Sequence, residues 1–219
     1  MAIKLELLKN IHYFSGLDST ELESIKKYIL QEDVKEGTVF LFQGERSDFL
    51  YFVVSGVVKV YKISSYGKEQ ILNIAHSGES VNDVSTFDGA PSPATMLAMT
   101  PVNLYKIRKD DLRTVMKNYP QVAQNALKVM AGRVRRDSTL VEDLSFTHVT
   151  VRLAKLLLKN ASEETITRLR LTQRDMAAIV GATRESVNKS IRIMEEKGAI
   201  RVTRQGIVIT NRQALSEFE

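Results

Sequence analysis

Apolar and polar positions recur with helical spacing between residues 171 and 193, in the segment LTQRDMAAIVGATRESVNKSIRI. Thr172 is placed to cap a first helix, with Asp175 three residues on as its capping-box partner. Gly181 interrupts the apolar series, and Thr183 is placed to cap a second helix. Two short helices joined by a glycine-containing turn are typical of a helix-turn-helix.

The outer face of the second predicted helix carries side chains that suit contact with DNA bases. A helix-turn-helix presents the N-terminal residues of its second helix to the major groove, where Arg bonds guanine in a bidentate way and Glu accepts from cytosine. Arg184 and Glu185 have these types and this place. The alternative is an ordinary helix pair whose polar residues are only solvated. The predicted DNA-binding residues are Thr172, Gln173, Thr183, Arg184, Glu185, Ser186, Asn188, Lys189 and Arg204.

The apolar period changes to that of strands between residues 33 and 107, after a helical region within residues 7–30. Short β-branched and aromatic runs are separated there by glycines at intervals of 7 to 12 residues. Many short strands at this spacing predict a compact antiparallel barrel or jelly roll. Such a barrel either holds a ligand or fills itself with side chains.

The helical period returns after residue 110 and continues through a long segment, 121–146. A narrow stripe along this segment suits a helix that pairs with its own copy in a dimer, and the alternative is a helix packed on its own barrel. A further helix at 149–158 leads into the helix-turn-helix, and residues 201–210 predict a hairpin, or wing, turning at Gln205 and Gly206. The predicted stripe is Leu127, Met130, Val134, Asp137, Val141 and Leu144.

Charge and composition narrow the functional class. Residues 146–219 contain 13 Lys and Arg against 8 Asp and Glu, whereas the first 145 residues contain 18 of each, so the whole net charge of +5 belongs to the predicted DNA-binding part. The chain has no cysteine, which excludes structural disulfides and cysteine-ligated iron–sulfur clusters. No stretch predicts a membrane span or a secretory signal, and we expect a soluble, cytoplasmic protein.

With the order of elements assembled, nearly the whole chain resembles the CRP/FNR family of bacterial transcription regulators. The resemblance rests on GTVFLFQGERSDFLYFVVSGVVKVY (37–61), GESVNDVSTFDGAPSPAT (78–95) and ATRESVNKS (182–190). It implies an α+β fold with an N-terminal antiparallel β-roll of the jelly-roll, cyclic-nucleotide-binding type (1–119), a long dimerisation helix (120–146) and a C-terminal winged helix-turn-helix (147–219). It also implies a homodimer that binds two-fold double-stranded DNA, responds to an effector in the roll and has RNA polymerase as a partner. Activation and repression both remain open.

The resemblance places Arg184, Glu185 and Lys189 where the cyclic-AMP-responsive branch has its Arg, Glu and Arg base readers, which implies a half-site related to TGTGA. Lys189 departs from that pattern, and a point charge discriminates guanine less well than the guanidinium fork does. Asn188 could add an adenine contact.

The effector site departs further from the family pattern. Cyclic-nucleotide-binding members hold the ribose with a Gly-Glu pair and the phosphate with an Arg-Ser or Arg-Thr pair. Those places are taken here by Asn82-Asp83 and Pro93-Ala94, and no Arg occurs between Arg46 and Arg108. A buried phosphate would lack its guanidinium and face a carboxylate, so we predict that cyclic AMP is not the effector. The predicted effector pocket is Asn82, Asp83, Val84, Pro93, Ala94 and Thr95.

Haem is a candidate effector, because another branch of the family holds haem and responds to nitric oxide or carbon monoxide. An apolar small molecule or a self-filled roll are the alternatives, and most single His and Met residues are ordinary surface or core groups. A metal-dependent barrel enzyme would need several His and Glu on adjacent strands, whereas the barrel segment has one His, and no P-loop, Gly-x-Ser-x-Gly or His-Glu-x-x-His motif occurs. We therefore expect that the protein is not an enzyme. A further alternative is a ligand-binding module alone, but such a module would give the basic C-terminal part no role. The candidate haem ligands are His12, His76, His148, Met96, Met99 and Met130.

Overall fold

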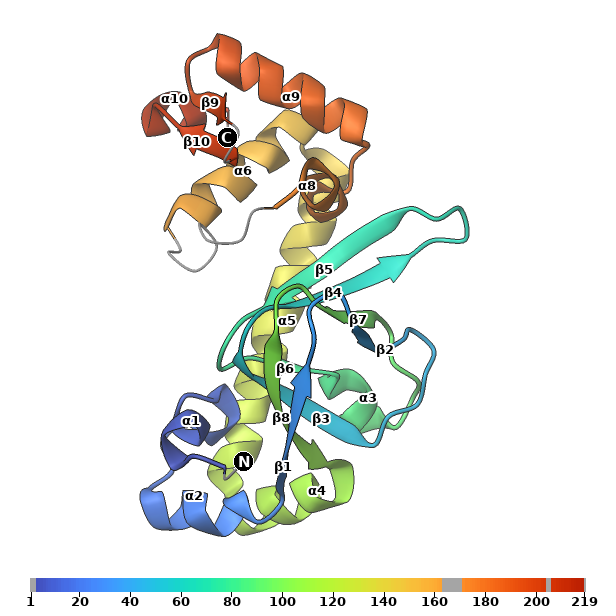
Figure 1. The fold of residues 1–219 in the computed structure, drawn as a ribbon, viewed down its shortest axis with the longest axis vertical. Helices are drawn as coiled ribbons and strands as arrows, with labels where there is room; N and C mark the ends of the chain where they lie inside the picture. The colour runs from blue at the N-terminus through green and yellow to red at the C-terminus, as the bar shows by residue number, and fades with distance from the viewer. Residues whose placement is uncertain (1–2, 163–170, 204–205, 219) are drawn as a thin grey trace. The chain divides into compact units, whose positions relative to one another are not determined.

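The computed structural model describes residues 3–162, 171–203 and 206–218. The fold is α+β, with an antiparallel β-roll, a long helix and a winged helix-turn-helix in that order (Figure 1). The roll and its flanking helices comprise α1 (Leu5–Lys9), η1 (His12–Phe14), α2 (Ser19–Lys26), β1 (Ile29–Val34), β2 (Val39–Leu41), β3 (Phe49–Ser55), β4 (Val58–Ile63), β5 (Glu69–Ala75), β6 (Ser80–Val81), α3 (Asp83–Asp88), β7 (Thr95–Ala98), β8 (Val102–Arg108) and α4 (Lys109–Asn118). The rest comprises α5 (Pro120–Phe146), α6 (Val149–Ser162), α8 (Gln173–Val180), α9 (Arg184–Glu196), β9 (Ile200–Thr203), β10 (Gly206–Ile209) and α10 (Arg212–Ser216).

Two four-stranded sheets form the roll, with the strand orders β1-β8-β3-β6 and β2-β7-β4-β5. Strand β3 is buried on both faces, since Tyr51 and Val53 join the core between the sheets while Leu50 and Phe52 join the core under the helices. Met96 of β7 is packed in the first of these cores and is 2% exposed. Apolar side chains from both sheets therefore form a core between them.

The expected change from helical to strand structure occurs, with two differences. The helical region ends earlier than residue 30, because α2 stops at Lys26 and Ile29 already pairs with Ile107 in the first sheet. The expected run of strands also contains a helix, α3, which begins directly after Asn82. Asn82 has the left-handed backbone conformation (φ 70°), which ends strand β6 and starts this helix.

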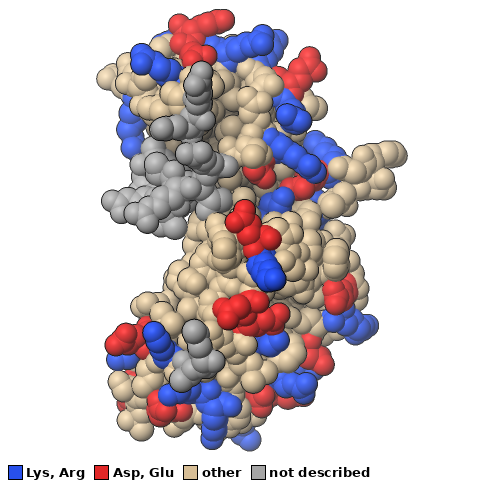
Figure 2. Space-filling view, viewed as in Figure 1, with Lys and Arg blue, Asp and Glu red and all other residues tan. Residues whose placement is uncertain are grey.

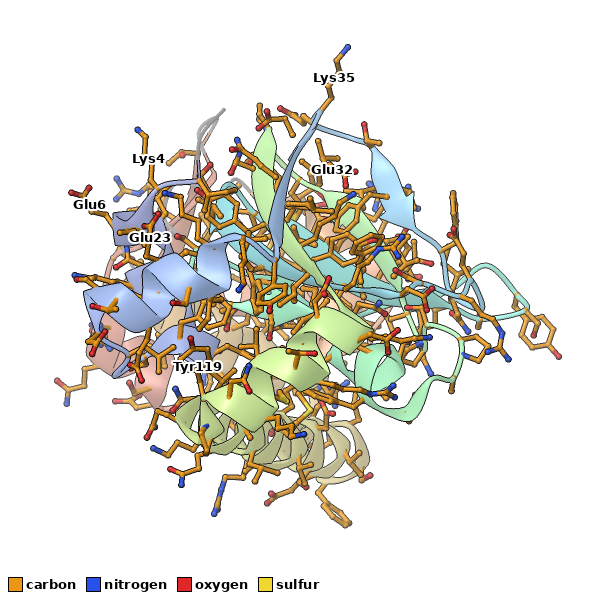
Figure 3. All side chains as sticks on the ribbon, turned by 90° about the horizontal axis from the view of Figure 1, so that it is seen from below. Lys4, Glu6, Glu23, Glu32, Lys35 and Tyr119 are labelled. Carbon is orange, nitrogen blue, oxygen red and sulfur yellow. The ribbon has the colours of Figure 1, made fainter. Side chains whose placement is uncertain are left out.

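The described residues divide into two compact units, and α5 contributes to both of them. The first unit is Met1–Ser64 with Leu72–Arg135, and the second is Ser65–Ile71 with Arg136–Glu219. Within the first unit, Figure 3 shows Lys4 and Glu6 near α1 and Lys35 near β1 with their side chains projecting outward. Among the described residues, no helix is sufficiently long and apolar to cross a bilayer.

Helix α5 begins on the surface of its own roll. Val122 and Ala126 are buried in the core under the helices. The amide Nδ2 of Asn125 donates to the backbone oxygens of Tyr13 (3.0 Å) and Ser15 (2.7 Å). One face of the first turns of α5 is therefore fixed to the roll, as expected for a helix packed on its own barrel.

Candidate nucleic-acid interface and effector site

Local hydrogen bonds fix the beginnings of both helices of the helix-turn-helix. Thr172 Oγ1 accepts from the backbone N of Asp175 (3.1 Å), and Asp175 Oδ2 accepts from the backbone N of Thr172 (3.0 Å), so the predicted capping box is confirmed. Thr183 Oγ1 accepts from the backbone N of Ser186 (3.1 Å) and caps α9. Gly181 ends α8 in the left-handed conformation (φ 68°), as a tight turn between two helices requires.

Apolar residues hold the two helices together and leave the opposite face of α9 free of the core. Val187, Ile191 and Met194 of α9 pack in one cluster with Met176 and Ala177 of α8. The small side chain of Ala177, buried in this cluster, permits a close approach of the two helices.

The predicted base-contacting residues lie on the open face of α9. Thr183, Arg184, Glu185 and Lys189 are exposed, whereas Ser186 and Asn188 are half-buried. Thr172 is exposed and Gln173 half-buried at the start of α8. Arg204 lies outside the described residues.

Sequence reasoning missed Arg192, which is exposed one helical turn beyond Asn188. The spacing of four residues from Asn188 was the available signal, because positions four apart share a helix face. The wing adds exposed Arg201 on β9. Strands β9 and β10 pair antiparallel with Gly206 opposite Thr203. Of the turn predicted at Gln205 and Gly206, Gly206 is the first residue of β10, and Gln205 lies outside the described residues. Basic and acidic side chains are interspersed on the face drawn in Figure 2.

A buried polar network occupies the first half of the predicted effector pocket. Asp83 is fully buried, and its Oδ1 accepts from Tyr13 Oη (2.5 Å) and from Ser80 Oγ (2.6 Å). Its Oδ2 forms an ion pair with Nη2 of Arg133 on α5, at 2.6 Å. Burial, and next the Asp83 carboxylate, raise the pKa of Tyr13 well above its ordinary value, so the phenol stays protonated as the donor.

Arg133 is the residue that sequence reasoning missed at this site. No Arg occurs between Arg46 and Arg108, and this one enters from α5, 50 positions beyond Asp83 in the sequence. Arg133 Nη2 also donates to the backbone oxygen of Ser80 (2.5 Å).

The second half of the predicted pocket has different partners. Thr95 Oγ1 accepts from the backbone N of Gln43 (3.0 Å), and the backbone oxygen of Ala94 accepts from Ser92 Oγ (2.8 Å). Pro93 is exposed, and Val84 of α3 is 45% exposed.

The candidate haem ligands lie in unlike surroundings. His12 and His148 are exposed, Met96 is packed in the roll, and Met99 and Met130 are half-buried. Nδ1 of His76 is buried without a hydrogen-bond partner among the described residues, which is the feature here that fits an axial ligand. In the same part of the chain, His, Asp and Glu do not gather in threes in a way that could hold a metal ion.

The apolar residues of the predicted stripe on α5 are mostly exposed. Leu127, Val134 and Val141 are 69%, 65% and 63% exposed at successive seven-residue steps, and Leu144 is 40% exposed. Asp137 is exposed and Met130 half-buried within the same series. Apolar side chains exposed together along one helix are typical of protein–protein contact surfaces.

Two family models match separate parts of the chain, a cyclic nucleotide-binding domain over residues 31–119 and a Crp-like helix-turn-helix domain over residues 151–218. The "CRP-like cAMP-activated global transcriptional regulator" of Mycobacterium tuberculosis is 30% identical over 218 residues, covering 96% of this chain and 97% of that protein. The chain belongs to the CRP/FNR family. The "Cyclic AMP receptor protein" of Thermus thermophilus is 26% identical over 195 residues, covering 89% of this chain and 90% of that one.

Solved structures of this family share the fold. A c-di-GMP-responsive global regulator, CLP, of Xanthomonas campestris has a TM-score of 0.79 at 19% identity and covers 88% of this chain and 99% of its own. FixK2 of Bradyrhizobium japonicum has a TM-score of 0.76 at 21% identity, covering 87% and 97%. This CRP/FNR chain is accordingly a transcription regulator with a cyclic-nucleotide-binding-type domain and a DNA-binding helix-turn-helix, and its relatives are regulators rather than enzymes.

Proposed function

We propose that this regulator acts as a homodimer that reads a two-fold DNA site with paired α9 helices. The observation that carries the proposal is the capped N-terminus of α9, which presents Arg184, Glu185 and Lys189 to solvent while the opposite face is held in the core. Arg bonded to guanine and Glu bonded to cytosine form a pair of base contacts in the major groove. We also propose RNA polymerase as a partner of the DNA-bound dimer.

The second copy of the chain would cover the stripe on α5. Val122 and Ala126 fix the start of the helix to its own roll, whereas Leu127, Val134 and Val141 are each more than half exposed, which suits a partner helix. Apolar side chains at seven-residue steps pack as knobs into the holes of a facing helix. Asp137 would then lie in the seam beside its symmetry mate, which disfavours one helix arrangement and could bias the switch.

The half-site is proposed to be related to TGTGA, with a weaker preference at the position that Lys189 reads. Lysine offers a compact charge, whereas arginine offers two parallel donors to guanine O6 and N7. Lys189→Arg should therefore sharpen discrimination against other bases at this position, while binding to non-specific DNA changes little.

The effector is proposed not to be a cyclic nucleotide, although relatives carry cyclic AMP in their names. The one guanidinium at the buried site is already paired with Asp83, and Pro93 and Ala94 have no side-chain donor for a phosphate. Binding of an anion would have to separate the Asp83–Arg133 pair and leave a buried carboxylate uncompensated.

Haem at His76 is a second candidate for the effector. It is favoured by the buried, unpartnered Nδ1 of this residue. Bound haem would supply a gas-binding iron. A Soret band after reconstitution that shifts with nitric oxide and is lost in His76→Ala supports this candidate, and an unchanged spectrum in His76→Ala contradicts it.

DNA binding is tested by gel retardation with a palindrome of TGTGA-type half-sites. We expect Arg184→Ala and Glu185→Ala each to weaken binding about 5- to 150-fold, since one good base contact contributes about 1–3 kcal/mol of discrimination. Arg113→Ala is the control, because Arg113 pairs with Asp110 on the exposed surface of α4. Equal retardation of all variants would contradict the proposal.

Effector binding is tested by calorimetry with cyclic AMP, cyclic GMP and cyclic di-GMP. The proposal expects no micromolar binding of any of the three at the roll. Micromolar binding of cyclic AMP that is abolished by Arg133→Gln would overturn it.

A further inference from the structure

The corner between α5 and α6 contains a side chain that joins two helix ends. Helix α5 ends at Phe146 and α6 begins at Val149, within the second unit. Arg152 lies in the first turn of α6 and is half-buried. Its place between the dimer stripe and the helix-turn-helix was not marked by any sequence pattern.

The guanidinium of Arg152 donates in two directions. On one side, Nη1 donates to the backbone oxygens of Asp143 (3.1 Å) and Thr147 (2.5 Å), at the C-terminal end of α5. On the other side, Nε donates to the backbone oxygen of Val180 (2.7 Å), the last residue of α8. The carbonyls at the C-terminal end of a helix carry partial negative charge, so one cation stabilises both ends.

The position of Val180 gives this contact a consequence for the recognition helix. Gly181 follows directly, Thr183 caps α9, and Arg184 is the first residue of α9, four positions after Val180. A hydrogen bond to Val180 therefore fixes the turn from which α9 starts. Helix α9 has 13 residues and is about 20 Å long at 1.5 Å per residue, so a small rotation at its start moves its far end by several ångströms.

We propose that Arg152 is a positioning residue that couples the end of the dimerisation helix to the orientation of the recognition helix. The inference rests on the proposed dimeric DNA-binding function and adds the residue that transmits the dimer geometry to α9. A second contact braces the same corner, because Lys155 Nζ lies 2.7 Å from Asp143 Oδ1. Arg152 itself bonds both helix ends, through Val180 on one side and Asp143 on the other.

The test uses Arg152→Lys in the full-length protein. Lysine keeps the charge at the corner but has no planar fork to bond carbonyls on two sides. We expect affinity for a palindrome to fall about 10- to 100-fold, while affinity for a duplex with a single half-site changes less than 3-fold. The preference for the native half-site spacing over one lengthened by 1 base pair should flatten. Arg113→Lys, in an exposed pair on α4, is the matched control and should change none of these.

A distance measurement keeps the proposal testable if affinity proves insensitive or the variant is less stable. The chain has no cysteine, so Glu196→Cys provides one spin label at the exposed end of α9 in each subunit. Electron double resonance should give a narrow distribution of the distance between the two labels when Arg152 is present, and a broader one in Arg152→Lys.

Each outcome has a distinct meaning. An equal loss on the palindrome and the single half-site, or identical distance distributions, would overturn the role of Arg152 and leave the proposed function standing. Two other results would instead overturn the dimeric function itself. One is the absence of a dipolar signal in the labelled protein that keeps Arg152, at a concentration at which the dimer should form, and the other is no preference for the palindrome.

Discussion

Asp83→Asn should destabilise the protein substantially, because it leaves Arg133 without its counter-ion. Removing one partner of a buried ion pair costs about 3–5 kcal/mol. Asp83 is fully buried, but the Arg133 side chain is 23% exposed, and water partly solvates the guanidinium. We therefore place the cost at the lower end, about 3 kcal/mol, which lowers the Tm of a chain of this length by about 6–12 °C. Thermal unfolding followed by circular dichroism at pH 7 measures this shift.

Asp48→Asn is the matched control, because Asp48 pairs with Lys109 (2.5 Å) but is 64% exposed. The hydrogen bond with Lys109 lowers the pKa of Asp48, yet a solvated pair adds little to stability, and its Tm should be unchanged. A double-mutant cycle with Arg133→Gln should give a combined loss smaller than the sum of the two single losses. Equal Tm values for Asp83→Asn and Asp48→Asn, or additive losses in the cycle, would refute the ion pair as a source of stability.

Three further outcomes are expected. Gly181→Ala should destabilise by about 1–2 kcal/mol in urea unfolding, because φ is +68° and a Cβ would lie 2.3 Å from Leu144 Cδ2; Gly132→Ala, in open space on α5, should instead stabilise by up to about 1 kcal/mol. Val134→Glu should convert a dimer to a monomer in analytical ultracentrifugation, and an unchanged dimer argues against the α5 seam. Burial raises the pKa of Tyr13, so the stability that the protonated phenol gives the folded protein is complete below pH 10 and is lost above pH 10, by up to about 1.4 kcal/mol per pH unit. Tyr13→Phe should flatten this dependence of the free energy of unfolding on pH, and an equal slope in both proteins would contradict the prediction.

The sequence predicted the parts of the fold that depend on neighbouring residues. The caps at Thr172 and Thr183 and the left-handed Gly181 are local features, and each is present where the pattern placed it. The prediction of strands between residues 33 and 107 was also correct, because the spacing of apolar residues in a strand reflects which side chains are buried in the roll. Helix α3 was missed because it has six residues, too few for a helical period to stand out among strands.

The candidate effector site was less predictable, because its central contact joins distant segments. Asp83 and Arg133 are 50 positions apart, and nothing near either residue specifies the other. The same holds for Arg152 and Val180, which meet only when α6 packs on α8. Exposure of Arg184 followed from helix periodicity, whereas its role in reading a base stays a prediction.

Binding to a palindrome as a function of half-site spacing tests the central proposal most directly. The proposed dimer predicts tight binding when the TGTGA-type half-sites lie on one face of the duplex, about one helical turn centre to centre, and a loss of about 100-fold or more when 5 base pairs are inserted between them. Equal affinity at the two spacings would show that paired α9 helices do not read the site together.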